Sequence, residues 1–127
     1  MAIAISAIMT SYNREKYIAE AIESVLNQKY SDFELIIVDD CSTDRTMDII
    51  HNYASKDSRI RVFQNNKNLG QFPNRNYAAS LAKANLLVYV DSDDTIQPDA
   101  FSFIVDCFTK YPDVGFLVSY YGNYFKA

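Results

Sequence analysis

The chain alternates between short apolar runs and stretches in which apolar residues recur every three or four positions. The apolar runs predict five strands, at residues 4–9, 35–38, 60–63, 86–90 and 114–118. The helical spacing predicts four helices between them, at about 14–28, 42–54, 73–83 and 98–108. Strands that alternate with helices in this way predict a three-layer α/β/α sandwich, with a mainly parallel sheet and right-handed crossovers.

Polar residues mark the predicted helix starts. Asn13 could cap the first helix, residues 42–44 open the second, and Pro98 suits the first turn of the last. The inward face of the third helix is predicted to include Tyr77 and Ala78.

Two of the predicted strands end in acidic residues. The run 33–38 is followed by Asp39 and Asp40, and the run 86–90 by Asp91, Asp93 and Asp94. Parallel strands present their carboxyl ends at one edge of the sheet, where open α/β sheets bind ligands. Carboxylates so close repel one another, so a divalent cation with oxygen ligands is the simplest partner, Mg²⁺ or Mn²⁺ rather than Zn²⁺. The alternative is that these aspartates only form turns and helix caps.

Length and charge narrow the class of protein. The 127 residues suit one domain, and no apolar run approaches the ~18 residues of a membrane span. The N-terminus lacks the basic residues of a signal peptide, and Cys41 and Cys107 do not suggest a disulfide framework, so a reduced cytosolic protein is expected. The net charge of −4 argues against nucleic acid or an anionic membrane as the main partner. One histidine, His51, gives little support to a Ser-His or Cys-His mechanism.

Other α/β functions fit less well. The first strand is followed by no glycine, so neither a dinucleotide fingerprint nor a phosphate-binding P-loop is present. A phosphoacceptor receiver domain needs acids after its first and third strands and a lysine after its fifth. Here those ends read Thr10-Ser11, Gln64-Asn65 and Ser119-Tyr120.

Four motifs, taken in order, resemble the family 2 glycosyltransferases with a GT-A (Rossmann-like) fold. They are residues 8–13 (IMTSYN), 37–44 (IVDDCSTD), 68–70 (NLG) with Arg75-Asn76 following, and 90–94 (VDSDD). The resemblance extends from Ile5 to about Phe116. One departure is Cys41, where this family more often has glycine or asparagine.

The resemblance implies a role for six residues in binding a nucleotide-sugar donor, most simply a UDP-sugar. Thr10 and Tyr12 would grip the nucleobase, with the Tyr12 ring stacking on uracil, and Asp40 would accept the uracil N–H. Arg75 would approach the base or a phosphate, unless it is a solvated charge or pairs with Asp99. Asp91 would face the ribose, and Asp91 and Asp93 would form the metal-binding DxD element. Asp94 would have a lesser, orienting role.

The resemblance also implies a carbohydrate or lipid-linked acceptor, as in cell-envelope polysaccharide synthesis, and a general base downstream of the DxD element. Only Asp99, Asp106 and Asp113 are available there, and none looks suitably placed, so no catalytic residue is assigned. We therefore expect residues 1–127 to be one donor-binding domain of a longer enzyme, inactive alone, cytosolic or at the inner face of the membrane. A non-catalytic nucleotide-sugar-binding subunit is the alternative. A homodimer through the aromatic residues 119–127 also stays open.

Overall fold

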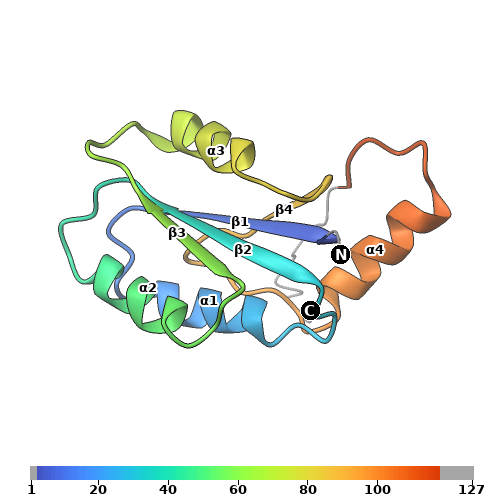
Figure 1. Ribbon diagram of the computed structural model, residues 1–127, viewed down its shortest axis with the longest axis horizontal. Helices are drawn as coiled ribbons and strands as arrows, with labels where there is room; N and C mark the ends of the chain where they lie inside the picture. The colour runs from blue at the N-terminus through green and yellow to red at the C-terminus, as the bar shows by residue number, and fades with distance from the viewer. Residues whose placement is uncertain (1–2, 118–127) are drawn as a thin grey trace, which may run out of the picture.

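The computed structural model describes residues 3–117, which form one four-stranded sheet with helices on both faces (Figure 1). The sheet order is β3-β2-β1-β4, and each pair of neighbours is parallel, as the alternation of strands and helices predicted. In chain order the elements are β1 (Ile5–Ser11), α1 (Ile18–Leu26), β2 (Phe33–Asp39), α2 (Thr46–Ala54), β3 (Ile60–Gln64), α3 (Gln71–Ser80), β4 (Leu86–Tyr89) and α4 (Ala100–Lys110).

Alternate residues of the central strands face two separate apolar layers. On one face, Ile5, Ala7 and Met9 of β1 join a buried cluster that includes residues of α1, α2 and α4. On the other face, Ile8 packs with Ile36, Val38 and residues of α3. Figure 1 shows α3 on one side of the sheet and α1 and α2 on the other. The predicted three-layer α/β/α fold is therefore confirmed.

The predicted fifth strand is wrong for the residues that can be judged. Residues 114–117 form no strand and are exposed, and Val118 lies outside the described residues. A strand is held by hydrogen bonds to a neighbouring strand. Residues 114–117 belong to no pairing of the described sheet, so their apolar character alone does not make them extended.

The first helix begins later than its apolar spacing predicted. Residues 14–17 form turns, in which the backbone N–H groups of Tyr17 and Ile18 donate to the carbonyl oxygen of Arg14, and α1 starts at Ile18. Asn13 is not its cap, because the Asn13 side chain accepts a hydrogen bond from the backbone of Thr43 instead. A competing partner from the segment after β2 thus defeats the capping prediction.

The second helix also begins later than predicted, at Thr46. Asp44 lies before the helix rather than in it, and its side chain accepts hydrogen bonds from the backbone N–H and the hydroxyl of Thr46. Pro98 precedes α4, which begins at Ala100. The buried positions of α3 are Asn74 and Ala78, about one helical turn apart. Ala78 is therefore buried as expected, whereas Tyr77 does not belong to the buried face and is exposed.

Two further observations bear on the class of protein. Cys41 and Cys107 are both free thiols, as expected of a chain without a disulfide framework. Within residues 3–117, no helix has the length and apolar character required to cross a membrane.

Candidate functional site

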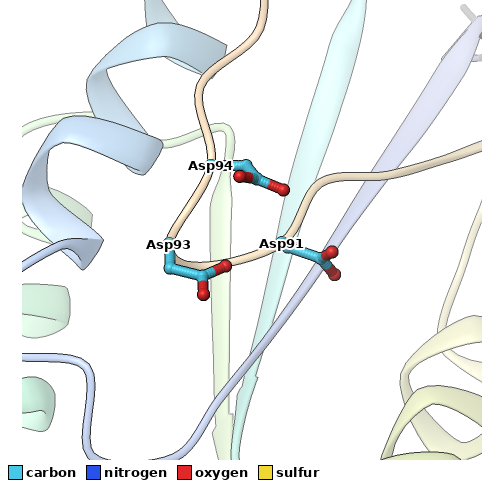
Figure 2. Close-up of side chains that lie close together, drawn as sticks. All are labelled: Asp91, Asp93 and Asp94. Carbon is cyan, nitrogen blue, oxygen red and sulfur yellow. The ribbon is translucent and has the colours of Figure 1, made fainter. Parts of the chain in front are cut away.

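The carboxylates of Asp91, Asp93 and Asp94 gather on a short turn directly after β4 (Figure 2). One oxygen of each lies within 4.8 Å of one oxygen of each of the others, and all three residues are exposed. The backbone N–H of Asp94 donates to the carbonyl oxygen of Asp91 at 3.1 Å, which folds the turn. Figure 2 shows the side chains of Asp93 and Asp94 extending toward Asp91. We call these three residues the acidic trio.

Two arginines from other parts of the chain approach the acidic trio. Arg75 of α3 makes an ion pair with Asp91, with 2.6 Å between Nη2 and Oδ1. Arg14, in the loop after β1, lies 4.0 Å from Asp93, measured from Nε to Oδ2. Partial burial raises the pKa of Asp94, and the charges of Asp93 and Asp91 raise it further. The three carboxylates supply oxygen ligands of the kind that a hard cation such as Mg²⁺ or Mn²⁺ prefers.

Asp39, the last residue of β2, is completely buried, and it is hydrogen-bonded to the segments around it. Its carboxylate accepts hydrogen bonds from the Ser11 hydroxyl at 2.7 Å, and from the backbone N–H and the hydroxyl of Ser42 at 2.8 and 2.5 Å. These contacts tie the end of β1 to the loop after β2. Asp39 is therefore a structural carboxylate rather than a ligand facing solvent.

Asp40 is also buried, and it organises the loop that leads into α3. Its Oδ1 accepts hydrogen bonds from the Asn65 side chain at 3.0 Å and the Leu69 backbone at 2.7 Å. Its Oδ2 accepts from the backbone N–H of Gly70 at 3.0 Å, immediately before α3. Because α3 carries Arg75, Asp40 helps to set the position of the arginine that meets Asp91. The family resemblance did not predict this structural role of Asp40.

The remaining predicted site residues lie at the same edge of the sheet. Thr10 is half-buried near the end of β1, and Tyr12 follows that strand with 44% of its surface exposed. Parallel pairing brings the ends of β1, β2 and β4 to one edge, so all six predicted residues belong to one region. Contact with a base, ribose or phosphate stays a prediction for each of them.

Two site features were missed or undervalued at the level of sequence. Arg14 carries no periodic or motif signal, and only the turn after β1 brings its guanidinium toward Asp93. Asp94 joins the trio as closely as its neighbours do. In contrast, the suggested pairing of Arg75 with Asp99 is wrong: Asp99 pairs with Lys29 at 2.8 Å.

Comparison with known proteins identifies the relatives of this chain. The family model described as Glycosyl transferase family 2 matches residues 6–126. A putative teichuronic acid biosynthesis glycosyltransferase, TuaG of Bacillus subtilis, is 42% identical over 95 residues, which are 75% of this chain and 38% of that protein. The chain thus spans well under half the length of this curated relative.

Solved structures have the same fold. TarS 1–349 of S. aureus in complex with UDP-GlcNAc superposes with a TM-score of 0.80 at 34% identity, covering 86% of this chain and 32% of that one. A mannosyltransferase from Pyrobaculum calidifontis, in complex with GDP-Man and Mn²⁺, gives a TM-score of 0.77 over 85% of this chain and 33% of that one. At 21% identity the second likeness concerns the fold alone.

Proposed function

The chain belongs to glycosyltransferase family 2, and we propose that it carries the donor-binding part of an enzyme that transfers a sugar from a UDP-sugar to an acceptor hydroxyl. The single observation that carries this proposal is the acidic trio, held with Arg75 and Arg14 at the carboxyl edge of a parallel sheet. A diphosphate needs positive charge around it, and this edge offers both guanidinium groups and oxygen ligands for a cation.

UDP is the nucleotide we favour because TarS, a 34% identical protein, has structures in complex with UDP-GlcNAc and with UDP. We assign the nucleobase to Tyr12 and Thr10, with the exposed Tyr12 ring available for stacking. A carboxylate can accept about four hydrogen bonds. Asp40 accepts three from the protein groups described above, so a further N–H, that of uracil, can still be accommodated on Oδ2.

The acidic trio is the proposed metal site, with Asp93 and Asp91 as the principal ligands and Asp94 beside them. When bound, Mn²⁺ or Mg²⁺ would offset the charge of the diphosphate and act as a Lewis acid toward the leaving group. The protein's own contribution is to hold the carboxylates on one turn. Arg75, already paired with Asp91, would lie beside the ribose or phosphates.

We propose that the general base and the acceptor site lie outside the residues described. Asp99 is paired with Lys29, and Asp106 and Asp113 are exposed residues on and after α4. Such a chain binds donor but transfers sugar poorly by itself. Efficient metal-dependent transfer by the 127 residues alone would contradict this assignment.

The test is calorimetric titration of UDP into the protein with and without Mn²⁺. We expect binding that requires Mn²⁺ and weakens at least about tenfold in Asp93→Ala, which corresponds to about 1.4 kcal/mol. The matched control is Asp99→Ala. It also removes an exposed aspartate, but one that forms an ion pair with Lys29 and lies outside the trio. Failure of UDP and of other nucleoside diphosphates to bind with Mn²⁺ present would refute the proposal, as would equal losses in the two variants.

A further inference from the structure

Asn13 has an unusual backbone conformation, and it lies between two residues of the candidate site. Its φ angle is +51°, in the left-handed region that few residues other than glycine and asparagine adopt readily. It stands between Tyr12, which we assign to the nucleobase, and Arg14, which approaches Asp93. The conformation of Asn13 therefore sets the direction in which the chain leaves Tyr12 and enters Arg14.

The Asn13 side chain and backbone are both bonded to the loop after β2. Its backbone N–H donates to the Ser42 hydroxyl oxygen at 2.9 Å. Its Oδ1 accepts from the backbone N–H of Thr43 at 2.8 Å and from the Thr43 hydroxyl at 3.4 Å. Ser42 is itself bonded to the buried carboxylate of Asp39. Asn13 is thus linked to the interior of the protein through two hydrogen-bonded steps.

The next two residues extend the same connection. The backbone N–H of Arg14 donates to the Thr46 hydroxyl oxygen at 2.8 Å, and that of Glu15 donates to Asp44 at 3.2 Å. Three consecutive backbone N–H groups of the loop after β1 are therefore satisfied by side chains of the segment after β2. The two loops behave as one unit, and only Asn13 combines the left-handed turn with an accepting side chain.

We propose that Asn13 is a positioning residue that directs the Tyr12 ring toward the nucleobase. The inference rests on the proposed function, since it concerns the same donor site. Asn13 does not touch the nucleotide in this proposal. It acts through Tyr12, by fixing the turn that the ring projects from, so its contribution to nucleotide affinity exists only while the Tyr12 ring is present.

Three variants separate the effect of the left-handed backbone conformation of Asn13 from the effect of its side-chain acceptor. Asn13→Ala loses the side-chain acceptor and is strained at positive φ, whereas Asn13→Gly accepts the backbone conformation but lacks the acceptor. Asn13→Asp retains an acceptor oxygen and, among side chains, tolerates positive φ comparatively well. In the presence of Mn²⁺ we expect the Kd for UDP to rise about tenfold in Asn13→Ala, about threefold in Asn13→Gly and by less than about twofold in Asn13→Asp.

A double-mutant cycle tests whether Asn13 acts through Tyr12. The Kd for UDP is measured by calorimetry for wild type, Asn13→Ala, Tyr12→Ala and the double variant, with thermal melting to confirm that each is folded. Positioning predicts that Asn13→Ala changes the Kd by less than about twofold once Tyr12 is alanine, because coupled residues are not additive.

The outcomes separate this inference from the proposed function. If wild type binds UDP but Asn13→Ala weakens binding equally with and without the Tyr12 ring, Asn13 only stabilises the fold and the inference is overturned. Asn13→Asp binding as weakly as Asn13→Ala, or Asn13→Ala binding as tightly as wild type, overturns it too. If wild type binds no nucleotide with Mn²⁺ present, the proposed function fails and this inference fails with it.

Discussion

Asp39 and Asp40 at the end of β2 are buried and accept hydrogen bonds from neighbouring loops, whereas Asp91, Asp93 and Asp94 after β4 are exposed and crowd one another. Around β2, serine hydroxyls, an asparagine amide and backbone N–H groups surround each carboxylate with donors. Around β4, the only charged groups that the described residues bring to the trio are the guanidinium groups of Arg14 and Arg75. Asp39, already supplied with donors, builds the site, and Asp40 does so while keeping one acceptor position for the proposed uracil N–H. The trio carboxylates have fewer donors than they can accept, so they are available to a ligand.

The largest effect should come from removing the most buried of these carboxylates. Asp39→Ala leaves the donors of Ser11 and Ser42 without their acceptor, so we expect the free energy of unfolding in urea to fall by about 3 kcal/mol. Asp93→Ala, an exposed aspartate at the end of the other strand, is the matched control, with a change below about 0.5 kcal/mol. Similar losses in both variants would remove the distinction between the two strand ends.

A smaller effect should come from the residue that follows Asp40. Cys41 has a φ angle of +67°, which costs a residue with a side chain about 1–2 kcal/mol. Cys41→Gly relieves this strain but gives the unfolded chain more freedom, so we expect a net gain of about 0.5–1 kcal/mol in thermal or urea unfolding. Cys41→Ala removes the thiol and keeps the strain, and should gain nothing. A destabilised Cys41→Gly would contradict this account.

The smallest effect should appear at the trio itself and should depend on pH. Because the pKa of Asp94 is raised in the folded protein, folding disfavours its charged form. The cost is absent below the unfolded pKa and grows as the pH rises through the folded pKa. Asp94→Asn should therefore be slightly more stable than wild type at neutral pH, by less than about 0.5 kcal/mol because solvent screens the exposed charges.

Two thermal melting experiments complete this prediction. The advantage of Asp94→Asn should vanish in acid, where Asp94 of the wild type is protonated. Addition of Mn²⁺ should stabilise wild type more than Asp94→Asn, because the cation binds a charged carboxylate better than an amide. An advantage that persists unchanged in acid would show that Asp94 is not strained by its charged neighbours.

The parallel sheet and the trio could both be predicted from the sequence, for physical reasons that act over short distances. Apolar runs such as 35–38 are too short for helices and too apolar for exposed strands, so they indicate a buried parallel sheet. Asp91, Asp93 and Asp94 lie within four positions, and one turn suffices to bring them together. The four motifs of the family resemblance also pointed to the edge of the sheet at which the trio lies.

The features that escaped prediction depend on contacts between distant segments. Asp39 and Asp40 are aspartates like those of the trio, so the sequence does not distinguish them. What sets them apart is hydrogen bonding from the distant residues Ser11 and Asn65 and from the nearby Ser42. Asn13 resembled a helix cap because its competing partner, Thr43, lies 30 positions away in the chain. Residues 114–117 have the apolar character of a strand, but pairing depends on a neighbour that the sequence pattern does not specify.

The position of β4 beside β1 has a consequence for how the protein folds. Ser6 of β1 contacts Glu34 of β2 across 28 positions of sequence, but it contacts Ala84, just before β4, across 78. Closing the longer loop costs more chain entropy, and contacts between remote residues slow folding. We therefore expect β1 and β2 to associate early and β4 to dock late. The acidic trio meets Arg14 and Arg75 only once β4 is in place, so the proposed donor site should be among the last parts of the fold to be completed.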